Sequence, residues 1–288
     1  MNKKYNLIDK YSGLISFEGI KVKVESFKKK KGNYHIMPIF LEEQPITWFL
    51  YKTEIENCLK GANSKILDVG TGSGIWALLL KKKFINAEVF AIDKNLDAIE
   101  LAKKNAQKNE LEINFLHKEF NTFYSRKDQN KYNVIILTPP YHLYPPEDED
   151  NIPYFARGGL YGQTEFYNQI ENSLKLLKDD GLIIFNMMSL GNETYPNYVN
   201  KIKKISPNLK LSFCNIFNSI KTETFLNEIY PNNTEYVNAV SQIYPMLYYT
   251  SGKIQKNEIF IVEETHNTIS LNRTWKDRIE LHKDINKF

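Results

Sequence analysis

Short apolar runs alternate with amphipathic segments through the middle of the chain, from about residue 64 to residue 190. Continuous apolar runs are typical of strands buried on both faces of a parallel sheet, and the amphipathic segments between them predict covering helices. The pattern therefore predicts an α/β fold with a doubly wound, mainly parallel sheet. The predicted strands span residues 66–69, 89–92, 113–116, 134–137 and 182–185, and the helix faces comprise Leu96, Ile99, Ala102 and Ala106 and then Phe166, Ile170, Leu174 and Leu177.

Two glycines are placed to end predicted helices. Apolar residues recur at helical spacing between residues 45 and 59, and Gly61 follows them. Gly181 follows the helix face that ends at Leu177. Because glycine readily adopts the left-handed conformation that closes many helices, we expect both helices to end at these positions.

The N-terminal region follows a different pattern, in which apolar and polar residues alternate between turn signals. This alternation predicts a β-hairpin appendage at residues 1–44, ahead of a main domain at residues 45–288. The lysine run within residues 28–32 fits a solvated hairpin turn or a contact with phosphate. The predicted strands of the appendage span residues 14–17, 20–24 and 34–40.

A tyrosine-rich insert at about residues 219–250 separates two further strand candidates, at residues 209–217 and 258–263. An ordinary connection between strands is far shorter than this. The insert could therefore form an apolar lid, or its tyrosines could serve ordinary packing. The tyrosines concerned are Tyr230, Tyr236, Tyr244, Tyr248 and Tyr249.

The charge is mildly basic, because 38 basic and 34 acidic residues give 38 − 34 = +4. Nearly all the positive charge is lysine, whereas nucleic-acid sites often use the planar arginine fork. The balance therefore permits an RNA substrate without favouring one.

The cysteines, Cys58 and Cys214, lack metal-ligand spacing, so we expect reduced, buried side chains and no metal site. No apolar run approaches the roughly 20 residues of a membrane span, and no signal sequence is apparent. We therefore expect a cytoplasmic protein with no membrane partner.

A glycine loop, Gly70-Thr71-Gly72-Ser73-Gly74, follows the first central strand and precedes a helix. Glycines allow unusual backbone angles and let a ligand approach the main chain, while the helix start presents free N–H groups. The dinucleotide fingerprint has the spacing G-x-G-x-x-G, but here the spacing is G-x-G-x-G and Asp68 precedes it. A carboxylate would repel a pyrophosphate and stabilise the ammonium of a methionine moiety. The loop therefore favours S-adenosylmethionine as the cofactor.

Three further residues follow the next two strands. Asp93, beside Lys94, ends the second strand and could accept both ribose hydroxyls, or it could cap the helix that starts near Leu96. Glu119 follows the third strand and could accept from the adenine amino group, or it could be a solvated loop acid.

The segment Thr138-Pro139-Pro140-Tyr141-His142 follows the fourth strand. The two prolines could form a purely structural turn, or they could aim backbone carbonyls at an amide or exocyclic amine while Tyr141 stacks on it. Methyl transfer from a sulfonium is a direct displacement that depends on such alignment. His142 could act as a general base or could simply be solvated or hydrogen-bonded.

At these motifs the chain resembles class I S-adenosylmethionine-dependent methyltransferases of the small-domain type, which include release-factor glutamine methyltransferases and RNA base amino-methyltransferases. The resemblance covers about residues 64–190, through LDVGTGSG, AIDKNLDAIELAKKNAQKN and ILTPPYH. It implies a Rossmann-like sheet of seven strands. Cofactor contacts carry over onto Asp68, Gly70, Gly72, Gly74 and Asp93, and the target clamp carries over onto Pro139, Pro140 and Tyr141.

Thr138 departs from this resemblance, because the family usually has Asn, Asp or Ser there to hold the target amino group. We expect methyl transfer to a nitrogen of a protein or RNA. The acidic run at residues 147–150 would oppose phosphate near the site, if it folds back over it. One alternative is N- or O-methylation of a small metabolite or modified peptide, and another is a non-catalytic cofactor-binding module. A nicotinamide-dependent oxidoreductase is disfavoured by the loop spacing and by Asp68.

Overall fold

The computed structural model describes residues 13–24, 36–37, 39–40, 43–61, 63–124, 131–159, 161–265 and 273–286. Contacts within the chain divide it into two compact units. Unit 1 comprises Met1–Thr138 and Asn172–Ile184, and unit 2 comprises Pro139–Glu171 and Phe185–Phe288. The boundary that the sequence predicts at residue 44 stays a prediction.

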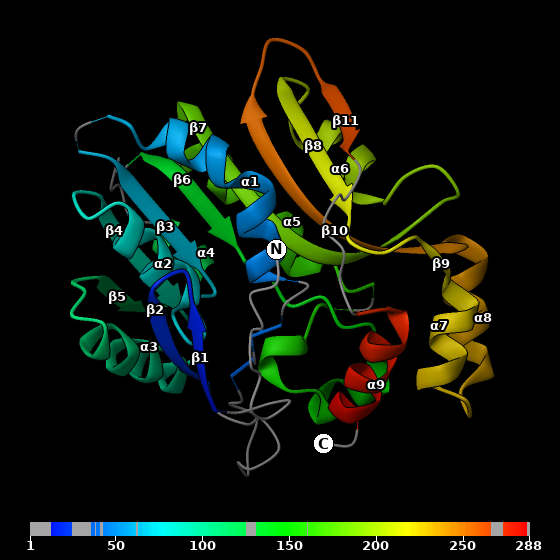
Figure 1. Ribbon diagram of the computed structural model, residues 1–288. Coiled ribbons are helices and arrows are strands. Elements are labelled where there is room, and N and C mark those ends of the chain that lie inside the picture. Colours follow the sequence, from blue (N-terminus) through cyan, green and yellow to red (C-terminus); the bar gives the residue numbers. More distant parts are fainter. Residues whose placement is uncertain are drawn as a thin grey trace. The chain divides into compact units, whose positions relative to one another are not determined.

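The sheet of unit 1 has the strand order β5-β4-β3-β6-β7, as Figure 1 shows. Strand β3 pairs in parallel with both β4 and β6, and β4 pairs in parallel with β5. The chain therefore leaves β3 on one side and returns on its other side, and ligands bind at such a reversal in open α/β sheets. The bounds are β3 Lys65–Val69, β4 Glu88–Asp93, β5 Asn114–His117, β6 Tyr132–Leu137 and β7 Leu177–Gly191, whose second half lies in unit 2.

The helices and the hairpin of unit 1 pack on this sheet. Asn95 caps α3, because its side-chain oxygen accepts from Asp97 N at 3.0 Å. Asn105 of α3 in turn holds the backbone of Lys23 in β2, accepting from its N at 2.8 Å and donating to its O at 2.9 Å. The Asn105 side chain thus bonds both backbone groups of Lys23, at the edge of the hairpin. The bounds are α1 Gln44–Cys58, α2 Ile75–Lys83, α3 Leu96–Lys108, α4 Phe120–Tyr124, β1 Gly13–Phe17 and β2 Ile20–Val24.

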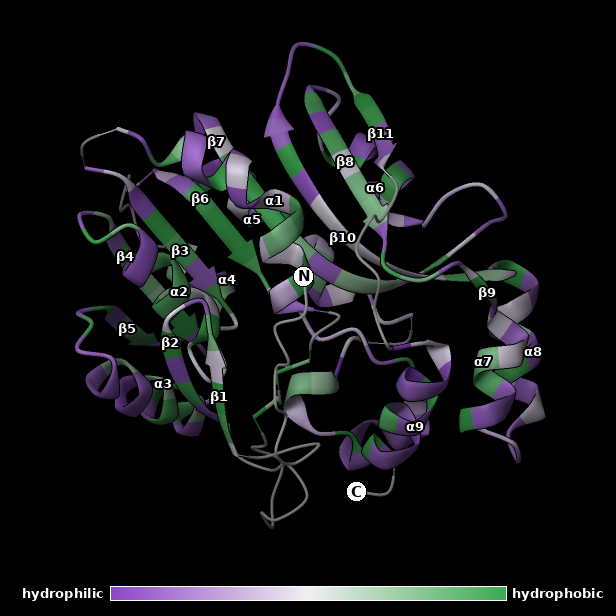
Figure 2. Cartoon of the chain, viewed as in Figure 1, coloured by the Kyte–Doolittle hydropathy of each residue, from purple (hydrophilic) through white to green (hydrophobic). Residues whose placement is uncertain are grey.

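The core of unit 1 follows from the alternation of side chains along each strand. Ile66, Val134 and Ile136 face one buried cluster, which also holds apolar side chains of α1, α2 and the hairpin. The neighbouring residues Leu67 and Ile135 are completely buried as well. Both faces of the central strands are therefore covered, and Figure 2 shows β6 as a mostly hydrophobic strand.

Unit 2 has the strand order β7-β10-β8-β11, and β9 pairs with β10. Strand β10 runs antiparallel to β8, and β11 runs parallel to it. A Cβ at Gly252 of β10 would lie only 2.2 Å from the Phe185 ring, so this glycine makes room for an aromatic core. The bounds are η1 Pro146–Asn151, η2 Tyr154–Ala156, α5 Thr164–Leu176, α6 Tyr198–Ile205, β8 Leu209–Asn215, β9 Ile220–Lys221, α7 Thr222–Ile229, α8 Thr234–Ile243, β10 Met246–Lys256, β11 Ile261–Thr265 and α9 Trp275–Ile285.

The mainly parallel α/β sheet predicted from the sequence is confirmed, but several details were wrong. More than seven strands form, because β9 and β11 add to the sheet. The sequence analysis missed β10 and placed the last strand three residues too early. Gly181 lies inside β7, after a helix that ends at Leu176. The polar residues 178–180 and Gly181 interrupt the apolar pattern as a turn would, so periodicity alone could not show that the strand already starts at Leu177.

Other predictions concern residues at the edges of the described ranges. Residues 36–37 and 39–40 carry no strand, and the rest of the predicted strand 34–40 lies outside the described residues, as does the lysine run.

Cys214 is buried as expected, but Cys58 is only half-buried. Among the described helices, none is both long and apolar enough to cross a membrane.

Candidate functional site

The glycine loop of unit 1 is fixed by backbone hydrogen bonds to the neighbouring strand. Gly70 N and Thr71 N both donate to Ile92 O, at 2.9 and 3.1 Å, and Gly74 N donates back to Thr71 O at 2.8 Å. The loop is therefore a closed turn between β3 and α2, and α2 starts at Ile75.

Two glycines of this loop are required for different reasons. Gly70 has a φ of 74°, and a Cβ there would lie 2.9 Å from Thr138 O, so a close approach of the two backbones excludes a side chain. Gly72 has a φ of 54°, but its nearest neighbour would be Ile36 Cγ2 at 3.9 Å. Packing within unit 1 therefore leaves room beside Gly72, where a ligand can reach the main chain.

Asp68 lies beneath the loop with no exposed surface. Its Oδ2 accepts from Thr71 Oγ1 at 2.7 Å and from Ala77 N at 3.1 Å, so it ties the loop to the first turn of α2. Its Oδ1 is buried and has no hydrogen-bond partner among the described residues. Burial raises the pKa of Asp68 to about 7, although both hydrogen bonds oppose that rise.

Asp93 links the second strand to the loop. Its Oδ2 accepts from Gly72 N at 2.9 Å, and its Oδ1 accepts from Asn95 N at 2.9 Å. Burial raises the pKa of Asp93, against the lowering effect of these two bonds. The residue that caps α3 through its side chain is Asn95 rather than Asp93. A carboxylate thus lies at the turn that contains Gly72.

Lys94 and Glu119 are both exposed. His117 Nε2 lies 3.1 Å from Lys94 O, and the carbonyl of Glu119 accepts from Thr122 N and Phe123 N at the start of α4. Both residues thus contribute backbone carbonyls to hydrogen bonds, the charge of Lys94 also lowers the pKa of Asp93, and their predicted contacts with a cofactor stay predictions.

Thr138 ends the part of unit 1 that contains the loop. Its Oγ1 lies 2.7 Å from Gly70 O and 3.0 Å from Val69 O, and its N donates to Val69 O at 3.1 Å. A hydroxyl has one proton, and here both neighbours are acceptors. The Thr138 hydroxyl therefore donates its one proton to the glycine loop. An Asn side chain would have two donors and an acceptor at this position.

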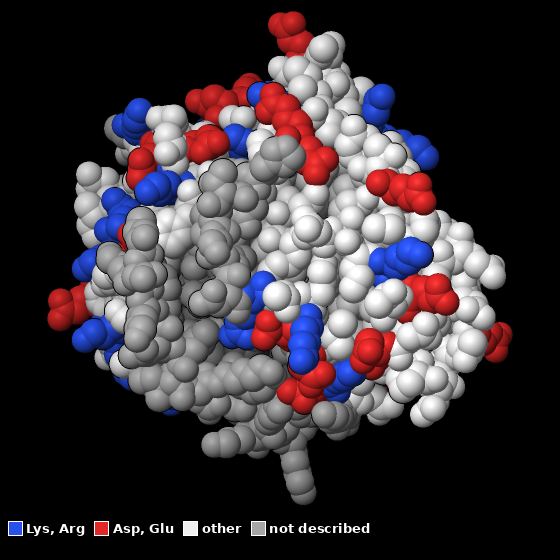
Figure 3. Space-filling view, turned by 45° about the vertical axis from the view of Figure 1, so that its right-hand side comes forward, with Lys and Arg blue, Asp and Glu red and all other residues white. Residues whose placement is uncertain are grey.

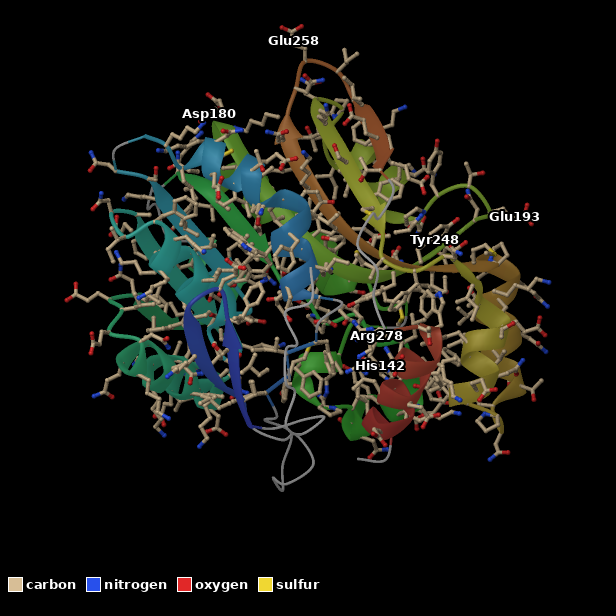
Figure 4. All side chains as sticks on the ribbon, in the orientation of Figure 1. His142, Asp180, Glu193, Tyr248, Glu258 and Arg278 are labelled. Atoms are coloured by element: carbon tan, nitrogen blue, oxygen red, sulfur yellow. The ribbon has the colours of Figure 1, made fainter. Side chains whose placement is uncertain are left out.

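The next residues, Pro139 to His142, belong to unit 2. Tyr141 is only 8% exposed, and its hydroxyl accepts from Arg278 Nη2 at 3.1 Å. Figure 4 labels Arg278, which lies on α9, and His142 close to that helix, and both side chains are buried. The predicted target clamp is therefore a buried segment held by the C-terminal helix.

His142 is buried, and both of its ring nitrogens have partners. Nε2 lies 2.8 Å from Asn286 Oδ1, and Nδ1 is hydrogen-bonded to Nδ1 of His282. Burial lowers the pKa of His142 to about 4. This geometry does not support His142 as a general base and agrees with the alternative of a hydrogen-bonded histidine, here a buried one.

The segment after the clamp is held by contacts of Arg157. The guanidinium of Arg157 lies over Tyr154 at 4.5 Å, and its Nε donates to Ile152 O at 2.7 Å. The acidic residues 147–150 form the short helix η1, which is largely exposed. No group of three His, Cys, Asp or Glu side chains that could hold a metal occurs in the described part of the chain.

Sequence reasoning missed the residues of α9 that contact the clamp, Arg278 and His282. The helix itself had a signal, because Thr274 and Asp277 form a capping box. No sequence signal indicated that this helix contacts Tyr141, because Arg278 and Tyr141 are 137 residues apart in the chain.

Four of the five tyrosines of the insert are buried, namely Tyr230, Tyr236, Tyr248 and Tyr249.

The parallel sheet, the glycine loop at its reversal point and the acid that ends β4 together define a doubly wound, nucleoside-binding type of α/β protein. Comparison with known proteins makes this more specific. Residues 53–152 match the family model of the methyltransferase small domain. This match confirms the resemblance to class I S-adenosylmethionine-dependent methyltransferases.

Similar sequences agree with this. The chain is 34% identical to a release factor glutamine methyltransferase of Flavobacterium psychrophilum over 161 residues, which cover 53% of this chain and 55% of that protein. It is 37% identical to the protein of the same name from Pasteurella multocida over 139 residues, covering 41% and 44%. The chain thus spans about half the length of these relatives.

Among solved structures, a SAM-dependent methyltransferase from Agrobacterium tumefaciens aligns with a TM-score of 0.52 at 14% identity, covering 85% of this chain and 70% of that one. At this identity the likeness shows the fold, which agrees with the doubly wound sheet.

Proposed function

We propose that this protein transfers a methyl group from S-adenosylmethionine to a nitrogen atom of a protein. The observation that carries the proposal is the carboxylate of Asp93 at the Gly72 turn, on a loop whose sequence matches a methyltransferase domain. The bound cofactor would supply an electrophilic methyl group on a sulfonium. The acceptor nitrogen would attack with its lone pair, the carbon–sulfur electron pair would stay on sulfur, and the nitrogen would release a proton to solvent.

Unit 1 would bind the cofactor. The buried Oδ1 of Asp68 and the room beside Gly72 fit a group that brings its own hydrogen-bond donors to this loop. Asp93 would accept from the ribose hydroxyls, and Gly70 and Gly74 would keep the turn narrow. Lys94, Thr71 and Glu119 complete the predicted contacts.

Unit 2 would contribute the acceptor clamp, Pro139, Pro140 and Tyr141. Prolines lack N–H groups, so a carbonyl in this segment can accept from the target without a competing donor. The names of the similar proteins, which specify glutamine in release factors, favour a protein side chain as acceptor.

One observation favours a second candidate, a small metabolite or modified peptide. The Thr138 hydroxyl donates to Gly70 O at 2.7 Å, so it cannot offer a donor and an acceptor together to a carboxamide. A methyl acceptor with a single exposed amine or hydroxyl would not need both.

Charge gives no support to an RNA acceptor. Figure 3 shows lysine and arginine side chains next to aspartate and glutamate, and among the described residues on this face no broad area of one sign is visible. Nucleic-acid binding depends on a basic surface that neutralises phosphates. The predicted cytoplasmic location stays a prediction.

Methyl transfer with tritiated S-adenosylmethionine tests the proposal. The full chain is incubated with cell lysate from its own source, which is then separated into protein, RNA and small-molecule fractions. We expect label in protein with the wild type and with Glu100→Ala, an exposed change on α3, but not with Asp93→Ala. Label in small molecules alone would favour the second candidate. Tight cofactor binding with no labelled fraction would overturn enzymatic function.

A further inference from the structure

The Tyr141 side chain of the clamp contacts α9. Arg278 Nη2 donates to the hydroxyls of both Tyr141, at 3.1 Å, and Tyr249. The guanidinium carbon lies 4.1 Å from the Tyr249 ring centroid and 5.9 Å from the Tyr141 ring centroid. Arg278 is 1% exposed, so one buried cation joins the clamp tyrosine to a tyrosine of β10.

The same face of α9 also holds the next residue of the clamp segment. His282 stacks on His142 with ring centroids 4.4 Å apart and 27° between the planes. Asn286, one turn further on, lies 2.8 Å from His142 Nε2. Positions 278, 282 and 286 are spaced by four residues, which places them on one face of a helix. The contact is therefore continuous along α9.

The backbone of the clamp is packed just as closely by a glycine turn. A Cβ at Gly158 would lie 2.9 Å from Tyr141 Cα, and a Cβ at Gly162 would lie 2.6 Å from Tyr141 O. His142 N donates to Ala156 O at 3.1 Å. These contacts restrain the backbone of Tyr141, and Arg278 adds a further restraint at the hydroxyl end of its side chain.

We infer that Arg278 is a positioning residue of the methyl acceptor site, acting on Tyr141 through its hydroxyl. This rests on the proposed function, in which Tyr141 belongs to the clamp. The rigid guanidinium fork can donate to two hydroxyls at a fixed angle, whereas a lysine ammonium is a point charge on a flexible stem. Alignment of acceptor and methyl group is what the reaction requires, so a shifted ring lowers the rate without altering cofactor binding.

A positioning role and a purely structural role for Arg278 predict different methyl transfer rates in two tyrosine variants. Tyr141→Phe and Tyr249→Phe each remove one hydroxyl from the same guanidinium and keep the ring. A structural role affects both variants alike. A positioning role affects the methyl transfer rate through Tyr141 and leaves it nearly unchanged through Tyr249.

The experiment measures tritiated methyl transfer by the full chain into the lysate fraction that the wild type labels, over a series of S-adenosylmethionine concentrations. We expect Arg278→Lys and Tyr141→Phe to lower the maximal rate about tenfold or more, with the apparent KM for S-adenosylmethionine unchanged. The double variant should be no slower than the slower single variant, because both changes break one interaction. Tyr249→Phe and the exposed Lys276→Gln should keep the wild-type rate. Equal losses in the two tyrosine variants, or no loss in Arg278→Lys, would overturn the inference.

A second readout does not depend on activity. Amide hydrogen exchange of residues 141–145 should become faster in Arg278→Lys, while that of residues 65–78 stays the same. If the wild type labels nothing but this pattern is found, the proposed function fails and the coupling of α9 to the clamp stands. Unchanged exchange at residues 141–145 would show that Arg278 does not hold this segment.

Discussion

Asp68 in unit 1 and His142 in unit 2 are both buried ionisable groups, yet different parts of the chain surround them. The hydrogen bonds to Asp68 come from Thr71 and Ala77, no more than 9 residues away. The shortest ones to the His142 ring come from His282 and Asn286, at least 140 residues away, and Tyr230 Oη, 88 residues away, lies 3.5 Å from Nε2. The buried acid beneath the glycine loop is thus held by neighbouring residues, whereas the predicted clamp is held by residues far along the chain.

This difference matters for function. A loop built from neighbouring residues can be shared by many methyltransferases, and the family match indeed lies at residues 53–152. A clamp supported by α9 depends on residues beyond that match. If the proposed assignments hold, changes at α9 should alter the proposed acceptor site while the glycine loop stays intact.

The largest effect is expected at the cofactor loop. Asp93→Ala should weaken S-adenosylmethionine binding by about a hundredfold or more, because it removes the hydrogen bonds of a charged acceptor and leaves Gly72 N without one. Equilibrium dialysis with labelled cofactor measures this. Glu100→Ala should bind as the wild type does. Unchanged binding in Asp93→Ala would mean that this acid does not contact the cofactor.

A pair of glycine substitutions should separate the two regions. Gly158→Ala places a Cβ 2.7 Å from Gly162 Cα, and Gly74→Ala places one 3.0 Å from Ala102 Cβ at a φ of 88°. Each should cost about 1–3 kcal/mol of unfolding free energy, since backbone atoms must move. Denaturant unfolding measures the cost.

Cofactor dialysis then gives the contrast between these two variants. Only Gly74→Ala should weaken binding, because only Gly74 belongs to the loop. Weakened binding in Gly158→Ala as well would show that the two regions are not independent.

Stability of unit 1 should fall as pH rises from about 4 to 7. The pKa of Asp68 is raised from 3.8 to about 7, so the folded unit keeps a proton that the unfolded chain has released. This stabilisation is complete below the unfolded pKa and is lost as pH rises through the folded pKa. Asp68→Asn should reduce that dependence, and Asp93, whose pKa burial also raises, should account for part of what remains.

Unit 2 should show the opposite trend. The pKa of His142 is lowered from 6.5 to about 4, so the unfolded chain binds a proton that the folded unit does not. Its contribution is present above the unfolded pKa and is lost as pH falls toward 4. His142→Gln should flatten this part of the profile.

The tryptophans allow the two trends to be followed separately. Of the three, Trp48 and Trp76 lie in unit 1 and Trp275 lies in unit 2. Fluorescence-monitored unfolding of Trp275→Phe therefore reports unit 1, and a variant with Phe at both other positions reports unit 2. The same pH trend in both units would contradict the assignment of the two shifts.

The smallest effect is expected at Thr138. Thr138→Val removes the hydroxyl that donates to Gly70 O and should cost about 1 kcal/mol in unit 1. Thr122→Val, which removes an exposed hydroxyl bonded to Glu119 O, is the matched control and should cost less. A loss no larger than that of the control would show that Thr138 does not stabilise the loop.

The sequence was informative where structure is local. Apolar runs and the glycine loop predicted the parallel strands and the position of Asp93, because strand, turn and helix start follow each other directly. It was uninformative about what Tyr141 and His142 contact, since no pattern near residue 142 refers to residues 278 and 282. For the same reason the sequence could not decide whether His142 is solvated or hydrogen-bonded, and the structure shows a buried, hydrogen-bonded ring.

The central claim is that the loop of unit 1 binds S-adenosylmethionine rather than a dinucleotide. Calorimetry of the unmodified full chain with each ligand tests it directly. The account predicts saturable heat at one site per chain with S-adenosylmethionine and none with NAD. Saturable binding of NAD, or no heat with S-adenosylmethionine, would contradict it.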